Sequence, residues 1–225
     1  MPRWCANCKV PSEGVNITVA AHPIQLAVLI SGSGTTLQNL IDCINSGTLD
    51  AKIALVIASK PGIAGIDRAK DAGLKIEIVE RKKFTTVSEF STQIFDRCDE
   101  NGIDLVCLAG WLSLLYMPTK WYGKVMNIHP ALLPAFGGPG LYGQRVHQAV
   151  LDHGAKVSGC TVHFVDATYD TGPIILQRSC PVLEGDTAAT LAQRVFQEEK
   201  IAYPEAIRLY QSGRLRVEGR RAFVL

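Results

Sequence analysis

From Ile24 onward, short apolar runs alternate with stretches in which apolar residues recur three or four positions apart. The runs contain few polar residues, which is typical of strands that are buried on both faces of a parallel sheet. The intervening stretches favour amphipathic helices, and each of them ends close to a glycine. In this half of the chain we predict strands at 25–30, 53–59, 75–79 and 105–109, and helices at 37–45, 65–72 and 87–101.

The second half carries more polar positions within its apolar runs. It predicts strands at 157–165 and 172–181, a long helix at 187–210 and a final hairpin at 214–225. Pro204 lies inside the helix, where we expect it to kink or restart the helix because proline lacks an N–H group. No linker separates the halves, so both should share one sheet. The predicted fold class is therefore α/β, a single domain with a mostly parallel, twisted sheet and helices on both faces.

The first 23 residues lack this pattern, so we expect residues 1–23 to form a flexible N-terminal arm and residues 24–225 to form the domain. Within the arm, Cys5 and Cys8 have the spacing of a metal-binding or redox pair. A zinc site needs two further ligands, and only His22 lies near. A redox pair would start a helix after a strand, and this pair precedes any clear element.

Composition narrows the function classes. Of 225 residues, 47% are hydrophobic and 20% charged, as in a globular protein, and no apolar run approaches the length of a membrane span. The net charge of +2 does not argue for a nucleic-acid or membrane partner, although a local cationic pocket stays open. Seven scattered cysteines favour reduced, mostly buried thiols. With no secretory pattern at the start, the cytoplasm is the expected compartment.

One stretch combines an amide, an imidazole and two prolines: Asn127-Ile128-His129-Pro130-Ala131-Leu132-Leu133-Pro134. It follows the apolar run at 124–126, so we predict a buried strand that leads into a rigid turn. If strand geometry persists, Asn127 and His129 point the same way. Together they could hold and protonate a developing oxyanion, as acyl transfer requires. The alternative is a strand end whose Asn127 caps a loop and whose His129 is incidental.

The turn at 32–36, Gly32-Ser33-Gly34-Thr35-Thr36, follows the first strand and precedes a helix. Free N–H groups at a helix N-terminus, with hydroxyl groups beside them, favour phosphate binding. The turn is not a P-loop, because no lysine follows its last glycine. It is not a full dinucleotide fingerprint either, because the third glycine of that motif is missing. The alternative is a tight turn with a threonine cap.

A third polar segment, 165–173, carries Asp166 and Asp170 ahead of Gly172-Pro173. A carboxylate beside His129 would favour the imidazolium and raise its pKa. The alternative is a polar turn in which the aspartate is a cap.

These segments together resemble the phosphoribosylglycinamide formyltransferases. The likeness rests on 29–34, on Leu108-Ala109-Gly110-Trp111, on 127–134 and on His163-Phe164-Val165 followed by 169–177, and it extends from residue 24 to about 215. The resemblance implies a Rossmann-like formyltransferase fold. It also implies transfer of a formyl group from 10-formyltetrahydrofolate, the co-substrate, to the amine of glycinamide ribonucleotide, with no metal.

The resemblance also implies roles for single residues. Asn127 and His129 would bind and protonate the formyl oxygen, and Asp170 would set the ionisation of His129. The implied ribonucleotide contacts are Gly34, Thr35 and Thr36 at its phosphate, together with Glu199. The implied pterin contacts are Leu112, Ser113, Leu114, Leu115 and Asp166. The oligomeric state stays open, with a homodimer as one option.

This chain also departs from the family. Bacterial members carry arginine where this chain has Val87 and Ser113, so other cations must hold the folate tail, with Arg81, Lys82 and Lys83 as candidates. The glycine-rich loop at 137–147 is longer than in those enzymes. We expect it to lie over the ribonucleotide, and an ordered surface loop is the alternative.

Three other functions compete. Methionyl-tRNA formyltransferase has an extra C-terminal domain, for which we expect no room before Leu225. Formyltetrahydrofolate hydrolase has an N-terminal regulatory domain, for which residues 1–23 are too short. The third alternative is an inactive nucleotide-binding module, which the presence of Asn127, His129 and Asp170 disfavours.

Overall fold

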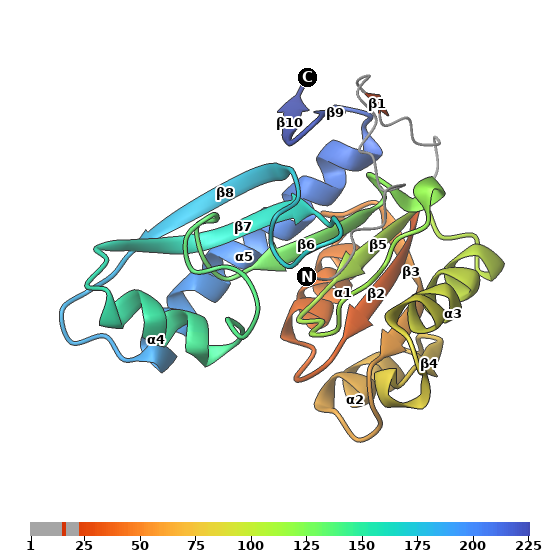
Figure 1. Cartoon of the computed structure of the whole chain (residues 1–225), viewed down its shortest axis with the longest axis horizontal. Helices are drawn as coiled ribbons and strands as arrows, with labels where there is room; N and C mark the ends of the chain where they lie inside the picture. Colours follow the sequence, from red (N-terminus) through yellow and green to blue (C-terminus); the bar gives the residue numbers. More distant parts are fainter. Residues whose placement is uncertain (1–14, 17–22) are drawn as a thin grey trace.

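The computed structural model describes residues 15–16 and 23–225 (Figure 1). The predicted arm, with Cys5 and Cys8, therefore lies outside the described residues except for 15–16 and 23. Among the residues described, no helix is both long and apolar enough to cross a bilayer. The five described cysteines, Cys43, Cys98, Cys107, Cys160 and Cys180, are free thiols, and all but Cys43 are buried. This agrees with the expectation of reduced, mostly buried thiols.

The strands of the described residues form one sheet in the order β1-β9-β10-β8-β7-β6-β5-β2-β3-β4. Their bounds are β1 Val15–Asn16, β2 Ile24–Ile30, β3 Ala51–Ala58, β4 Ile76–Ile78, β5 Leu105–Leu108, β6 Val125–His129, β7 Val157–Phe164, β8 Ile174–Pro181, β9 Leu215–Glu218 and β10 Arg221–Val224. The neighbours from β4 to β6 are all parallel, which confirms the predicted parallel sheet. β7 and β8 extend it in antiparallel fashion, and β9 and β10 form the predicted final hairpin.

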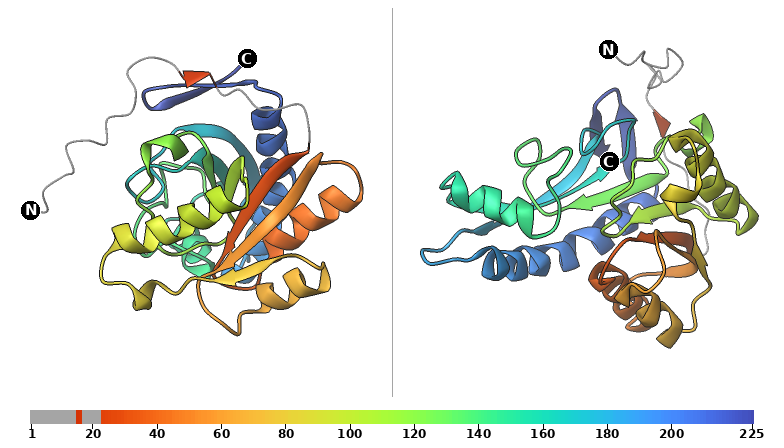
Figure 2. Two further views of the ribbon diagram at one scale, coloured as in Figure 1. Left: turned by 90° about the vertical axis from the view of Figure 1, so that its right-hand side faces the viewer. Right: turned by 60° about the horizontal axis from the view of Figure 1, so that its bottom comes forward.

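Helices cover both faces of this sheet, as predicted (Figure 2). They are α1 Thr35–Asn45, α2 Ala64–Asp71, α3 Val87–Glu100, α4 Gln144–Asp152 and α5 Ala188–Gln211, with short 3₁₀ turns at Arg81–Lys83 and Thr119–Trp121. Residues of α1, α2, α4 and α5 share one buried apolar cluster, whereas α3 packs into a second cluster across the sheet. Alternate residues of β2 divide between them: Leu26 and Val28 join the first cluster, and Ala27 and Leu29 join the second.

The prediction that Pro204 interrupts the last helix is wrong in one respect, because α5 continues through it without restarting. Proline cannot donate to the carbonyl of Lys200 four residues earlier. Instead, the Asn39 amide of α1 donates to that carbonyl at 3.1 Å, and Asn39 is itself buried. The freed acceptor is thus satisfied from a neighbouring helix, which lets an interior proline remain in a continuous helix.

This explanation predicts the effect of a single change. Asn39→Ala should lower the free energy of unfolding by about 1–3 kcal/mol, because it leaves the Lys200 carbonyl without its donor. Urea unfolding of the variant and the unaltered protein measures the difference. The matched control is Asn39→Ala combined with Pro204→Ala, which restores the backbone donor to Lys200. We expect Asn39→Ala to cost less free energy of unfolding in Pro204→Ala protein than in the unaltered protein. Equal costs in the two proteins would contradict the explanation.

Helix α4 was not predicted, and residues 144–147 of the expected loop belong to its first turns. Val146 and Val150 are buried one helical turn apart, which is the signal that could have revealed it. The segment directly follows a run of glycines, and Gly143 immediately before the helix has a φ of 55°. The glycines made the whole stretch look like a loop.

Candidate active site

Strand β6 carries the central pair of polar residues. The strand persists through His129, so Asn127 and His129 lie two apart on one face, as expected. Antiparallel pairing with β7 places His163 opposite Asn127 and Thr161 opposite His129. The register between two strands therefore determines which side chains meet at this site.

Thr161 fastens the turn that follows β6. Its buried hydroxyl donates to the Ala131 carbonyl at 2.7 Å and accepts from the Leu133 N–H at 3.0 Å. The Gln177 amide of β8 donates to the same hydroxyl and to the Leu133 carbonyl, both at 2.9 Å. Side chains of two neighbouring strands thus set the path of the chain after His129.

His129 is 4% exposed and is held from both sides of its ring. Nε2 lies 2.8 Å from the Phe136 carbonyl oxygen, and because a carbonyl only accepts, Nε2 must carry a hydrogen. Nδ1 faces the Asp170 carboxylate at 3.5 Å. The sequence expectation that Asp170 lies beside His129 therefore agrees with the geometry.

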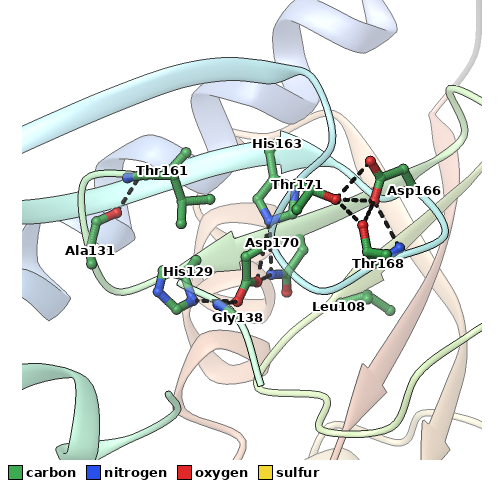
Figure 3. Close-up of polar contacts among 12 residues, drawn as sticks. Leu108, His129, Ala131, Gly138, Thr161, His163, Asp166, Thr168, Asp170 and Thr171 are labelled. Atoms are coloured by element: carbon green, nitrogen blue, oxygen red, sulfur yellow. Dashed lines mark hydrogen bonds and ion pairs between the residues drawn. The ribbon is translucent and has the colours of Figure 1, made fainter. Parts of the chain in front are cut away.

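Asp170 is at the centre of the polar network (Figure 3). One carboxylate oxygen accepts from the Gly138 N–H at 2.9 Å, and the other lies 3.4 Å from the Asn127 amide nitrogen and 3.7 Å from His163 Nε2. Burial alone would raise the pKa of Asp170, but the His163 imidazole, the charge of His129 and the Gly138 N–H together hold this pKa below its usual value. Asp170 is therefore a carboxylate at neutral pH.

His163 is a member of this network to which the sequence analysis assigned no role. Its Nδ1 lies 2.8 Å from the Phe164 carbonyl oxygen and donates to it, and its Nε2 lies 3.1 Å from the Asn127 amide nitrogen. His163 thereby orients the amide of Asn127. The signal was present in the chain: Thr161 and His163 are polar residues two apart in a mostly apolar strand, and so share one face.

The ionisation of His129 depends on burial as well as on Asp170. Burial lowers the pKa of His129 below its usual value, and this outweighs the opposite effects of the Asp170 carboxylate and the Phe136 carbonyl. Asp170 pushes the pKa upward, as expected, but does not determine its final direction. The resting imidazole is therefore neutral at pH 7.

Asp166 has a different position from Asp170. Its carboxylate accepts from the Thr168 N–H at 3.1 Å and from the Thr171 hydroxyl at 2.7 Å, so this residue stabilises the turn (Figure 3). The Thr168 and Thr171 hydroxyls also contact each other. Asp166 is not among the residues that line the cavities described below. The turn-capping role considered for Asp170 thus falls to Asp166.

The glycine turn between β2 and α1 has the backbone features that anion binding at a helix N-terminus requires. Gly34 precedes α1 with a φ of 71°, and no side chain caps the helix, contrary to the threonine-cap alternative. A Cβ atom on Gly34 would lie 2.6 Å from the Gly65 Cα, so the close approach of α2 also requires glycine here. The first N–H groups of α1 are therefore left available at its N-terminus.

A cavity of about 590 Å³ connects this turn with the polar network. The expected site residues that line it are Thr35, Thr36, Leu112, Asn127, His129, Asp170 and Glu199. Gly34 is buried beneath the turn. Residues 138–144 form another part of the lining, so the glycine-rich loop does face the cavity. Burial raises the pKa of Glu199 to about 7.

A second, smaller hollow of about 50 Å³ adjoins the first. Its lining includes Ser113, Leu114 and Leu115, whereas Leu112 lies in the main cavity and is 47% exposed. The two spaces share Trp111, Asn127, Tyr169 and Asp170. The expected pterin contacts are thus brought together, apart from Asp166 and Leu112.

The candidate cations for the folate tail are already engaged. Lys82 and Lys83 contact the Glu80 carboxylate at 3.0 Å and 2.6 Å. Arg81 donates to the Phe84 carbonyl and lies over the Phe90 ring. Among the residues that the structure describes, no group of three or more His, Cys, Asp and Glu side chains could hold a metal ion.

Comparison with known proteins agrees with this geometry. The sequence profile described as "Formyl transferase" matches residues 24–207. The trifunctional purine biosynthetic protein adenosine-3 of Gallus gallus is 40% identical over 88% of this chain, which spans only 20% of that protein's length. The chloroplastic phosphoribosylglycinamide formyltransferase of Vigna unguiculata is 35% identical over 91% of this chain and 68% of its own.

A solved structure extends the likeness to three dimensions. Glycinamide ribonucleotide transformylase 1 from Symbiobacterium toebii superposes with a TM-score of 0.85 at 44% identity, covering 92% of this chain and 96% of that one. The family profile covers most of the domain, and the strands that carry Asn127, His129 and His163 fall inside it. This chain therefore belongs to the formyl transferase family.

Proposed function

We propose that this protein transfers a formyl group from 10-formyltetrahydrofolate to the amine of glycinamide ribonucleotide, a step of purine biosynthesis. The observation that carries the proposal is a single cavity lined both by Thr35 and Thr36 of the glycine turn and by Asn127, His129 and Asp170. A substrate with a phosphate at one end and a nucleophile at the other matches this arrangement. The names of the similar proteins support the same choice.

On the substrate side, the turn at Gly34, Thr35 and Thr36 would bind the phosphate through N–H groups and the dipole of α1. Glu199 of α5 lines the same cavity and would accept hydrogen bonds from the ribonucleotide. Its raised pKa fits this role, because a partly buried carboxyl group without a charge partner gains most from a ligand's donors.

The reacting end is explained by the resting geometry. Amine attack on a formyl carbon places negative charge on the formyl oxygen, which needs hydrogen-bond donors and then a proton. The Asn127 amide nitrogen carries two hydrogens. It lies 3.1 Å from His163 Nε2, and its 3.4 Å contact with Asp170 is long for a hydrogen bond, so one N–H can donate to that oxygen instead. The ionised Asp170 lies beside Nδ1 of His129 and stabilises its protonated form when a proton has to be supplied.

The smaller hollow has walls of the chemistry that a folate ring would contact. Leu108, Leu114, Leu115 and Val165 make it apolar, and a flat ring would bury well against such residues. Folate supplies the formyl group when bound. Leu112 and Ser113 lie in the same segment of chain, at the rims of the two spaces.

The direct test mixes purified protein with glycinamide ribonucleotide and 10-formyltetrahydrofolate and follows both products. Formation of tetrahydrofolate and formylated ribonucleotide in equal amounts supports the proposal. Tetrahydrofolate released with free formate, without formylated ribonucleotide, identifies a hydrolase instead. No turnover, with the ribonucleotide still bound, identifies an inactive nucleotide-binding module.

The glycine turn gives a sharper prediction. Gly34→Ala should raise the KM for the ribonucleotide strongly, because the added Cβ clashes with Gly65 and strains the left-handed backbone. Gly32→Ala is the matched control, because a Cβ atom on Gly32 would meet no other atom within 4 Å. Steady-state kinetics of the two variants decide the matter. Equal KM values for both, or unchanged affinity for a substrate without its phosphate, would show that the turn is only structural.

We also propose that the protein works in the cytoplasm. The unpaired, buried cysteines described above suit a reducing compartment.

Small-molecule substrates are the only partners that the proposed reaction requires. A homodimer is the oligomeric form that light scattering should test.

A further inference from the structure

Two residues at the site have a strained backbone. Among the residues that the structure describes, Phe136 with a φ of 54° and Asp170 with a φ of 56° are the non-glycine residues with a positive φ. The left-handed conformation is unfavourable for side chains with a Cβ atom, and most of all for bulky ones. Both residues contact the ring of His129, one at each nitrogen. Strained backbone at two residues that contact the same side chain is an indication of function.

The segment after Phe136 explains how this conformation is maintained. A Cβ atom on Gly137 would lie 2.5 Å from the Leu133 side chain and 3.2 Å from the Asp170 Cβ, so the backbone is pressed between them. The Gly138 N–H then donates to Asp170 at 2.9 Å. These contacts leave the carbonyl of Phe136 directed at Nε2 of His129, at 2.8 Å.

This contact decides which nitrogen of His129 is free for chemistry. With the hydrogen of the neutral ring committed to Nε2, the remaining lone pair is on Nδ1, which faces Asp170. Without the Phe136 carbonyl, the other tautomer would be favoured, because Nδ1–H could donate to the Asp170 carboxylate.

We propose that Phe136 is a positioning residue: its left-handed backbone directs a carbonyl at His129, selects the Nε2–H tautomer and so makes Nδ1 the nitrogen that passes the proton to the formyl oxygen. The assignment rests on the proposed function. The step begins after the neutral resting ring has taken up a proton from solvent at Nδ1, beside the Asp170 carboxylate, to give the imidazolium. The Nδ1–H bond then breaks and its electron pair stays on Nδ1. A lone pair of the oxyanion forms the new O–H bond, and His129 returns to its neutral form with Nε2–H still bound to Phe136.

The competing explanation is that Phe136 acts only through its ring. That ring is partly buried, packs against the main apolar cluster and meets the His153 ring edge-on at 5.3 Å between centroids. The two explanations predict opposite orders of kcat for a β-branched residue and a glycine at position 136. A β-branched residue keeps apolar contact but resists a positive φ, whereas glycine loses all contact but adopts this φ freely.

The first experiment therefore compares Phe136→Val with Phe136→Gly, with Phe136→Asn as a second residue that tolerates the left-handed region. We expect kcat of the valine variant to fall by a factor on the order of 10² below that of the glycine variant, with similar KM values. If the glycine variant does not fold, the asparagine variant takes its place in the comparison. A kcat for valine equal to or above that of glycine or asparagine would overturn the proposal.

The second measurement needs no turnover. The ¹⁵N shifts of histidine side chains, recorded at pH 8 where His129 is neutral, report which nitrogen carries the hydrogen. We expect Nε2–H in the unaltered and glycine proteins and a shift toward Nδ1–H in the valine protein. An unchanged tautomer in the valine protein refutes the inference. Because this reading uses the resting protein, it stays valid if the protein turns out not to transfer formyl groups, which would refute the proposed function alone.

Discussion

His129→Ala is expected to lower kcat by a factor of about 10²–10⁴, which is the usual contribution of a positioned acid–base group. The geometry predicts this because the His129 ring is held by the Phe136 carbonyl, faces Asp170 and lines the main cavity, which His163 does not. Single-turnover kinetics, which isolate the chemical step, provide the measurement.

The control for this variant is binding. Affinity for the ribonucleotide should change much less than kcat, because the turn at 34–36, which we propose to bind the phosphate, is separate from the Asn127, His129 and Asp170 network. Calorimetric titration of the variant with the ribonucleotide tests that expectation. A kcat close to that of the unaltered protein would exclude His129 from the mechanism, whereas lost binding would assign it to substrate recognition.

Asp170→Asn is expected to reduce kcat and to shift the pH profile. The Asp170 carboxylate raises the pKa of His129 against the larger lowering effect of burial, so removing its charge should lower that pKa further. The acid form of His129 is present below its pKa and is lost as pH rises through it. The decline in activity attributed to that acid should therefore begin at a lower pH in the variant, which a profile of kcat against pH will show.

The matched control is Asp166→Asn, which removes a carboxylate from the same loop. Asp166 contacts Thr168 and Thr171, and it does not contribute to the pKa shift of His129. Its variant should keep the pH profile of the unaltered protein. If Asp170→Asn keeps both full turnover and that profile, Asp170 has only a structural role, and the proposed role of His129 loses its main support.

Much of the fold could be predicted because its strands are marked by local patterns. The strands β2, β3, β5 and β7 were placed within about two residues of their observed ends, as is usual for strongly periodic segments. The two errors, at α4 and at Pro204, arose where a local rule was overridden by contacts. Glycines hid a helix with only two buried valines, and a buried amide from α1 satisfied the carbonyl that proline had freed.

The site was predictable to the extent that strand geometry alone places side chains. Asn127 and His129 share a face because they lie two apart on one strand, and Asp170 was expected beside His129 through the resemblance. His163 received no role, because its meeting with Asn127 depends on the antiparallel register of β6 and β7. A one-residue slip in that register would turn His163 to the other face of the sheet.

The sequence by itself thus determined the α/β pattern, the glycine turn and the presence of an amide, an imidazole and a carboxylate. These follow from periodicity and residue chemistry, which are local. Only the tertiary structure decided which nitrogen of His129 carries the hydrogen, that burial lowers its pKa, and that Asp166 rather than Asp170 stabilises the turn. Each of these three features depends on contacts between distant segments and on the exclusion of water around them. No single position of the chain encodes such contacts or such burial.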